Sequence, residues 1–265
     1  MTSPRRAVVV AYRPHHNTQG GLFAEGLRRR GWAAVVSTSP MPCDLLVLWG
    51  VRDRHHIANQ LAEGGQVCVL ERGYLGDRMR HTSVSFGGRL NGRAEFRTPP
   101  GASLDRFHAL GLELKPWVSN PEGYVLIMGQ VPGDQSIRHV DIDQWYVRTH
   151  GALMAKGFRK VFFRPHPLAS RVAWTSSLPI LRGDLAHALH AARLVVTFNS
   201  NAGVDAILAG VPTVAMDAGS MVRDVAAHDI QMVTPDRAEW AARLAWCQWT
   251  DSELASGFCQ EVVGL

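Results

Sequence analysis

Short apolar runs separated by helix-like stretches dominate the chain and restrict how it can fold. In the first half, helical patterns at 20–31 and 54–65 alternate with apolar runs at 6–12, 32–38, 44–50 and 66–71. The second half repeats this alternation, with apolar runs at 123–130, 160–167, 193–199 and 212–217. Strands that are apolar throughout and separated by helices are typical of a parallel sheet covered on both faces. The chain is therefore predicted to be an α/β protein with two Rossmann-like lobes that face a central cleft.

The alternation breaks between residues 72 and 120, where Gly, Pro and Arg dominate and the segment "SFGGRLNGRAEFRTPPG" lies in the centre. We interpret this stretch as loops that end the first domain. The predicted domains are residues 1–115 and residues 116–265, and a helix expected at 235–249 belongs to the second.

The bulk composition excludes some classes of protein. No apolar stretch approaches the roughly 20 residues of a membrane span, so no such span is expected. The four cysteines show no metal-binding spacing, which favours free thiols and a cytoplasmic location; they are Cys43, Cys68, Cys247 and Cys259.

The net charge of +5 is unevenly distributed. Residues 1–115 contain 16 Lys and Arg against 9 Asp and Glu, whereas residues 116–265 contain 12 against 14. A basic first half indicates an anionic partner such as nucleic acid or phosphate. A solvated basic face is the alternative interpretation.

Ligands of open α/β sheets bind beyond the carboxyl ends of the strands, so the residues that follow each strand are the candidates. Arg13 and His15 follow the first strand, and Gly20-Gly21 is expected to open a helix whose free N–H groups could bind an anion. Glu71 ends the fourth strand, where a carboxylate can act as a general base on a hydroxyl. An ion pair of Glu71 with Arg72 or Arg78 is the structural alternative.

Polar residues also follow the strands of the second half. Gln130 ends one strand, and a turn then presents Asp134. Arg164 and His166 follow the next strand, and the two prolines of "RPHP" hold His166 in place, as suits contact with an anionic oxygen. The run Asn199-Ser200-Asn201 lies where a strand meets a helix, and one of the three residues is expected to be the N-cap.

Four segments carry a resemblance to a known family. "VLIMGQVPGDQSI", "RPHP" and "TFNSNAGVDAILAGVPTVA", in this order, resemble the capsule-polysaccharide-synthesis group of glycosyltransferases, which includes the bacterial Kdo transferases. "ERGYL" is similar to the Glu-x-Gly-aromatic motif of that group. The resemblance covers roughly residues 66–76 and 124–217. It implies the two-lobed GT-B architecture, with a nucleotide-sugar donor held largely by the C-terminal lobe.

The resemblance also implies roles for the candidate residues. Gln130 and Asp134 would line the site near the sugar, with Asp134 catalytic, and Glu71 would be the base that faces the acceptor. The donor phosphate would be held by Arg164, His166, Asn199, Ser200 and Asn201. No DxD motif stands at a strand end, so the expected reaction needs no metal and no tightly bound cofactor. The donor substrate is expected to be a UDP- or CMP-sugar.

The remaining segments depart from that family, since the chain is short and "SFGGRLNGRAEF" and "DRAEWAARLAWCQWTDSELASG" look like compact proteins encoded by tailed phages. Such phages glycosylate hydroxymethylated bases in their own DNA. The predicted acceptor is therefore a hydroxymethylated pyrimidine in DNA, contacted by Arg13, His15, Arg78, Arg89 and Arg93. A glycan acceptor, or a non-catalytic nucleotide- or DNA-binding module of the same fold, is the alternative.

Overall fold

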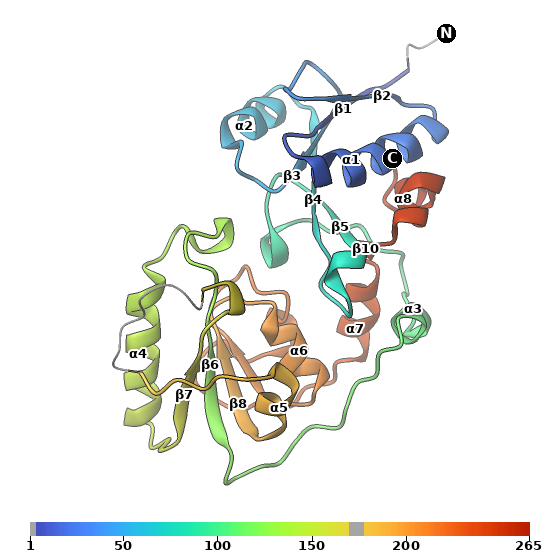
Figure 1. Cartoon of the computed structure of the whole chain (residues 1–265). Coiled ribbons are helices and arrows are strands. Elements are labelled where there is room, and N and C mark those ends of the chain that lie inside the picture. The colour runs from blue at the N-terminus through green and yellow to red at the C-terminus, as the bar shows by residue number, and fades with distance from the viewer. Residues whose placement is uncertain (1–3, 170–177) are drawn as a thin grey trace. The chain divides into compact units, whose positions relative to one another are not determined.

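The computed structural model describes residues 4–169 and 178–265, which form two compact units (Figure 1). The first unit comprises the chain up to Leu112 together with Ala241–Leu265, and the second comprises Glu113–Trp240. Each unit has its own sheet and helices, which confirms the predicted division into two α/β lobes.

The first unit contains a six-stranded sheet in the order β10-β5-β4-β3-β1-β2. Four strands are mutually parallel, as predicted; they are β1 (Arg6–Val10), β2 (Ala33–Ser37), β3 (Leu45–Trp49) and β4 (Gln66–Arg72). The strand β5 (Thr82–Phe86) lies in the segment predicted to be loops, and it pairs with β4 in the antiparallel direction. The sequence hides this strand because Thr82, Ser83 and Ser85 are polar although they are buried.

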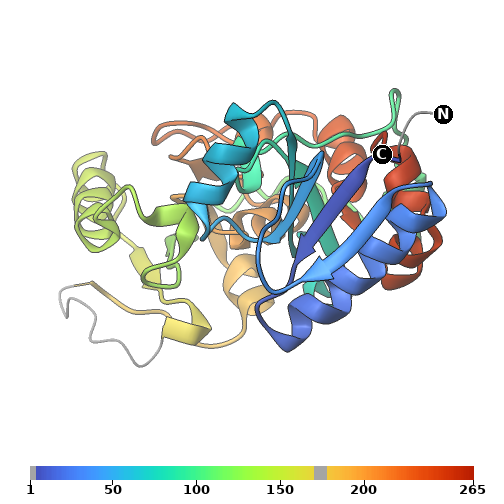
Figure 2. The ribbon, with the colours of Figure 1, turned by 90° about the horizontal axis from the view of Figure 1, so that it is seen from above.

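Helices cover both faces of this sheet, because successive strand residues point to opposite sides. Val9, Val47 and Cys68 face α1 (Pro14–Arg29), α8 (Asp251–Ser256) and α9 (Phe258–Val262). Val8, Leu46 and Val67 face α2 (Arg54–Ala62). Figure 2 shows α1 and α2 on opposite sides of the strands. A short helix, α3 (Asp105–Ala109), follows β5.

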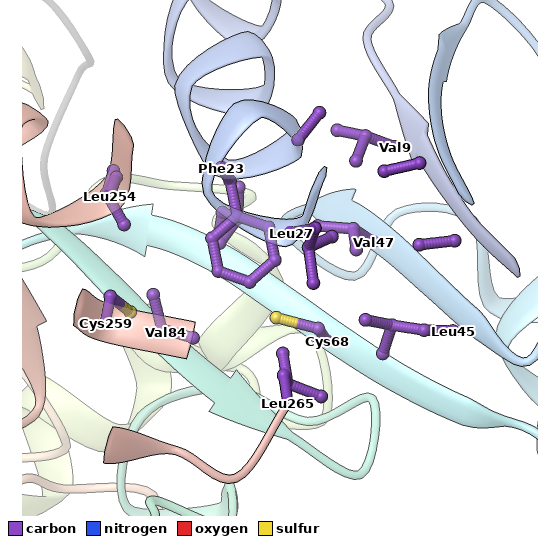
Figure 3. Close-up of a cluster of buried hydrophobic side chains, with 14 of the residues drawn as sticks. Val9, Phe23, Leu27, Leu45, Val47, Cys68, Val84, Leu254, Cys259 and Leu265 are labelled. Atoms are coloured by element: carbon purple, nitrogen blue, oxygen red, sulfur yellow. The ribbon is translucent and has the colours of Figure 1, made fainter. Parts of the chain in front are cut away.

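The C-terminal segment completes the first unit. The helix α7 spans Ala238–Ala245, and β10 (Gln248–Trp249) then pairs with β5. Leu254, Cys259 and Leu265 lie in the same buried cluster as Phe23 and Val84 (Figure 3). The predicted boundary, which placed all of 116–265 in the second domain, therefore differs from the observed grouping. The helical pattern at 235–249 correctly indicated a helix. The residues after this helix pack on the first sheet through contacts with residues distant in sequence, which a local pattern does not report.

The helix α1 begins six residues before the predicted start. It starts at Pro14, a favoured residue of a first helical turn, so Gly20 and Gly21 lie inside the helix and do not open it. A Cβ on Gly20 would lie 2.8 Å from Val9 Cγ1, which shows that this glycine allows α1 to pack closely on β1. The expectation of free N–H groups at Gly20-Gly21 is therefore wrong.

The second unit contains a four-stranded parallel sheet in the order β7-β6-β8-β9. Its strands are β6 (Tyr124–Met128), β7 (Val161–Arg164), β8 (Ala192–Thr197) and β9 (Thr213–Ala215). Its helices are α4 (Ile142–Ala155), α5 (Leu185–His190) and α6 (Ala202–Leu208). Val125, Ile127 and Val196 belong to a cluster on one side of the sheet, and Leu126 and Val195 belong to another. Over the described ranges, no helix of either unit combines the length and the apolarity needed to cross a membrane.

The close contact between α1 and α8 gives a stability prediction. A Cβ on Gly26 would collide with the carbonyl oxygen of Leu254, so Gly26→Ala is expected to lower the free energy of unfolding by about 1–3 kcal/mol. Gly21→Ala, in the same helix, is the matched control, since its Cβ would meet no described atom within 4 Å. The control is expected to raise stability by up to about 1 kcal/mol through helix propensity. Urea unfolding measures both, and equal shifts would contradict the packing of α8 on α1.

Candidate functional site

The carboxyl edge of the second sheet is organised by two buried amides. Gln130 follows β6, and Asn199 follows the neighbouring strand β8. Gln130 Nε2 donates to Asn199 Oδ1 (2.6 Å), and the Asn199 backbone N–H donates to Gln130 Oε1 (3.2 Å). The Gln130 backbone N–H donates to the hydroxyl of Tyr146 in α4 (2.8 Å). The two strand-end residues that the sequence singled out therefore meet, but both are buried and bound to protein groups.

Asn199 also links two further segments of this edge. Its Nδ2 donates to the carbonyl oxygen of Ser136 (3.0 Å) and to Oδ2 of Asp217 (3.0 Å). Asp217 is buried, accepts from the Gly219 backbone N–H (2.7 Å), and lies 3.1 Å from His139 Nε2. Buried carboxylates require such donors. Sequence reasoning missed Asp217, although it stands just beyond β9 and the same strand-end rule would have selected it.

Asp134 shapes the loop that follows β6. Its Oδ1 accepts from the backbone N–H (2.8 Å) and the hydroxyl (2.7 Å) of Ser136. Ser136 Oγ in turn lies 3.4 Å from Asn199 Oδ1. Asp134 is exposed, so this edge presents its carboxylate at the surface while the loop beneath is fixed.

The "RPHP" segment packs directly against the end of β6. The Gly129 backbone N–H donates to the Arg164 carbonyl (2.8 Å), and a Cβ on Gly129 would lie 2.9 Å from that oxygen. Arg164 Nη2 donates to the Gly183 carbonyl (2.9 Å). His166 Nδ1 accepts from the Leu168 backbone N–H (3.2 Å), so the neutral ring has its proton on Nε2. Both side chains are half-buried at the edge that Gln130 and Asn199 organise.

At the start of α6, the residue at the N-cap position is not the residue whose side chain accepts a backbone N–H. Asn201 occupies the N-cap position, with α-helical backbone angles and no capping hydrogen bond from its side chain among the described residues. Ser200 Oγ instead accepts from the Ala202 backbone N–H (3.3 Å), and the Ser200 backbone N–H donates to Thr197 Oγ1 (2.8 Å). Asn199, Ser200 and Asn201 therefore differ in role: the first is buried, and the other two are half-buried.

Glu71 lies at the carboxyl edge of the sheet in the first unit. It is half-buried near the end of β4, and a Cβ on Gly50 would lie 2.9 Å from its Oε1. The guanidinium of Arg72 lies over the Trp49 ring, 5.2 Å from its centroid. Gln248 Oε1 accepts from the backbone N–H groups of Tyr74 and Leu75, which fixes the chain after Glu71.

A cluster that sequence reasoning missed lies at the same sheet edge, beyond β1 and β3. The Tyr12 hydroxyl donates to Asp53 Oδ2 (2.8 Å), and His56 Nδ1 lies 2.6 Å from Asp53 Oδ1. Burial alone would raise the pKa of Asp53, but hydrogen bonds from His56 and Tyr12 outweigh it and lower that pKa. Partial burial, followed by the bond to Asp53, raises the pKa of Tyr12 to about 12. A signal was available for Asp53, which follows the predicted strand at 44–50, whereas Tyr12 ends the predicted strand at 6–12 and His56 lies within the predicted helix at 54–65.

The basic residues expected to contact an acceptor come from three places in the first unit. Arg13 is exposed at the N-cap of α1. His15 belongs to the first turn of α1, but its side chain lies outside the part of the structure that is described. Arg78 begins a short 3₁₀ turn after β4, and exposed Arg89 and Arg93 follow β5.

The loop that contains Arg89 and Arg93 is joined to the segment after Glu71. The Tyr74 hydroxyl donates to Asn91 Oδ1 (3.3 Å), and the rings of Tyr74 and Phe96 pack edge to face. Within 4–169 and 178–265, no three His, Cys, Asp or Glu side chains are grouped closely enough to hold a metal ion. Metal independence stays a prediction.

The amide network gives a prediction for the second unit. Asn199→Ala leaves polar groups of Gln130 and Asp217 buried without this partner, so we expect the free energy of unfolding to fall by about 1–3 kcal/mol. Gln144→Ala, at an exposed position in α4, is the control and should stay within about 0.5 kcal/mol of the parent. Thermal and urea unfolding measure the difference. A loss for Asn199→Ala no larger than that of the control would contradict the network.

The Tyr12 cluster gives a spectroscopic prediction. The tyrosinate absorbance is measured after rapid pH jumps in the parent protein and in Tyr12→Phe. The difference between the two, which reports Tyr12 alone, should titrate with a pKa of about 12. The protonated hydroxyl donates to Asp53, so Asp53→Asn should lower this pKa while leaving it above the ordinary value of about 10. An unchanged Tyr12 pKa in Asp53→Asn would contradict the hydrogen bond.

Comparison with known proteins supports the fold. No protein-family model and no curated protein matches the sequence. The structure is similar to the beta Kdo 2,4 transferase of Thermosulfurimonas dismutans KpsC, with a TM-score of 0.62, 14% identity and coverage of 92% of this chain and 90% of the other. It is also similar to the beta Kdo 2,7 transferase of the same KpsC, with a TM-score of 0.59, 12% identity and coverage of 98% and 99%. The chain therefore has the α/β fold of these two transferase structures.

Proposed function

We propose that the protein is a glycosyltransferase that uses a nucleotide sugar as donor. The observation that carries this proposal is that three strand-end segments meet at one edge of the second sheet, at Gln130, Arg164 and Asn199. The chain that contains this edge has the fold of the KpsC transferases. A ligand site at the carboxyl edge is the general expectation for such a sheet.

The donor is proposed to bind at this edge of the second unit. Gln130 and Asn199 are buried, so their role is to fix the surrounding loops. Arg164 and His166, with Ser200 and Asn201 from the start of α6, supply the donors for the phosphate oxygens of a UDP- or CMP-sugar. Positive charge and N–H donors placed there would stabilise the phosphate as it departs. Asp134, exposed on the neighbouring loop, is proposed to lie near the sugar.

The acceptor is proposed to be a hydroxymethylated pyrimidine base in DNA, bound by the first unit. Glu71 accepts the proton of the hydroxymethyl group as its oxygen bonds to the anomeric carbon and the sugar–phosphate bond breaks. Support comes from charge: the first unit contains 16 Lys and Arg against 11 Asp and Glu, and the second contains 12 against 12. Exposed arginines such as Arg89 and Arg93 would contact phosphates while the base is displaced from the duplex.

A glycan acceptor is the second candidate, because the similar KpsC structures are named Kdo transferases. The deciding experiment incubates the protein with UDP- and CMP-sugars, together with hydroxymethylated DNA, unmodified DNA or a Kdo-containing glycan. Mass spectrometry of the digested nucleosides and of the glycans detects the transferred sugar. A mass gain only on hydroxymethylated nucleosides supports the proposal, and a gain on the glycan supports the second candidate. Binding without transfer to any acceptor would indicate a non-catalytic module.

Substitution of Glu71 tests its role in the proposed reaction. Glu71→Gln is expected to spare donor binding and to lower turnover by about 100-fold or more, because a general base contributes a factor of this order. His166→Ala is expected to weaken donor binding instead. Glu63→Gln, at an exposed position after α2, is the matched control and should leave both quantities unchanged. Full turnover of Glu71→Gln would exclude it as the base.

A further inference from the structure

A pocket lies at the amino edge of the second sheet, on the edge opposite Gln130 and Asn199. It has a volume of about 190 Å³ and is formed by the turn that precedes β6, the turn between α4 and β7, and the first residues of β8. In Figure 1 the chain reaches this edge where it turns into β6 at the bottom of the second unit. The residues that matter most for its chemistry are Glu122, Phe158, Arg159, Lys160 and Arg193.

The backbone directs Arg193 to this pocket through an irregular pairing of strands. Tyr124 pairs with Ala192, but the next residue, Val125, pairs with Leu194. The register thus shifts by one residue, and Arg193 is left without a partner residue in β6. Such bulge-like shifts re-aim a side chain and are frequent next to functional sites.

The guanidinium of Arg193 is held in place by two contacts, but not all of its N–H groups have a hydrogen-bond acceptor in the described part of the chain. Its Nη1 donates to the Pro121 carbonyl (2.9 Å), and its carbon lies 5.3 Å from the centroid of the Phe158 ring. Its Nε is buried and has no hydrogen-bond acceptor among the residues that the structure describes. A buried donor without an acceptor is costly, and more so on a charged group. A ligand in the pocket would not reach this enclosed Nε, but it would add a partner to the outer nitrogens of the same guanidinium.

The charge of the pocket selects the class of ligand. Arg159, Lys160 and Arg193 supply three positive charges, and Glu122 supplies one negative charge. Lys160 Nζ is anchored on the Glu122 carbonyl (3.0 Å), which keeps its charge at the rim. The Gly123, Val125 and Gly157 backbone N–H groups already donate to carbonyls, so the donors available to a ligand come from the cations.

We propose that this pocket binds a single divalent oxyanion of the phosphate type, with Arg193 as the central ligand and Lys160 and Arg159 at the rim. The net balance of two positive charges fits a dianion, and the planar guanidinium fits its oxygens. The volume is below the 300–1,000 Å³ typical of pockets that enclose whole small molecules, so one phosphate group fits better than a nucleotide. This site is independent of the proposed sugar transfer.

The test titrates the protein with inorganic phosphate and with sulfate against sodium chloride of equal ionic strength. The side-chain Nε–H resonance of Arg193, assigned by its loss in Arg193→Gln, is followed by ¹H–¹⁵N NMR. Phosphate and sulfate in the millimolar range should shift this resonance in a saturable way, and chloride should not. Acetate, a monoanion, should bind more weakly. An Arg193 Nε–H resonance that does not respond to phosphate overturns the proposal.

Variants separate this pocket from the donor edge and from changes in folding. Lys160→Gln, which leaves Arg193 in place, should weaken phosphate affinity by about ten-fold, as expected for the loss of one bond to a charged group. Arg148→Gln, at an exposed position on α4, is the control and should bind phosphate like the parent. Arg164→Gln should also retain the Arg193 shift, because Arg164 lies at the other edge. Loss of the shift in Arg164→Gln but not in Lys160→Gln would place the anion at the donor edge and overturn the proposal.

Discussion

The paired hydrogen bonds between Gln130 and Asn199 are the constraint on which the candidate site depends. The Gln130 side chain both donates to Asn199 Oδ1 and accepts from the Asn199 backbone N–H, which requires an amide at position 130. The remaining Nδ2 proton reaches Asp217, which would repel a carboxylate at position 199. One amide thereby joins the ends of β6 and β8, the loop at Ser136 and the end of β9. The loops that present Arg164, His166 and Ser200 rest on this buried frame, and this explains how short loops can hold polar side chains in fixed positions.

The two edges of the second sheet differ in that only the carboxyl edge has a network of buried amides among the described residues. At the carboxyl edge, buried amides and Asp217 bond to one another, and half-buried Arg164 and His166 lie around them. Arg164 Nε is buried there without a described acceptor. At the amino edge, Arg193 is brought in by a register shift and retains a buried Nε without a described acceptor. Satisfied networks stabilise a structure, whereas an unsatisfied donor at a pocket favours an added ligand. The same parallel sheet therefore has a bonded amide frame at its carboxyl edge and an incompletely paired arginine at each of its two edges.

The sequence predicted the parallel strands well because apolar runs at fixed spacing report burial directly. It could not separate the roles of Asn199 and Asn201, because a buried amide that fixes a loop and a half-buried amide at a helix start look the same before their partners are known. The return of Trp249 to the first sheet was hidden for a similar reason, since its partner Thr82 is distant in sequence. The pair Gly20-Gly21 suggested a helix start, but close packing on Val9 explains Gly20 better. Local pattern thus located the strand ends, and long-range contacts decided what each end does.

Charge provides the last constraint on the proposed acceptor. The whole net charge of +5 resides in the first unit even after the acidic C-terminal segment is added to it. Several of its arginines are nevertheless committed to packing: Arg5 lies over Trp32, Arg97 lies over Phe86, and Arg106 is bound to Glu253. Phosphate contacts would therefore fall to exposed residues such as Arg13, Arg52, Arg54 and Arg89. The salt dependence of DNA binding scales with the number of phosphates that the protein contacts. The slope of log affinity against log salt concentration would therefore be moderate, and it would correspond to fewer phosphates than the unit has basic residues.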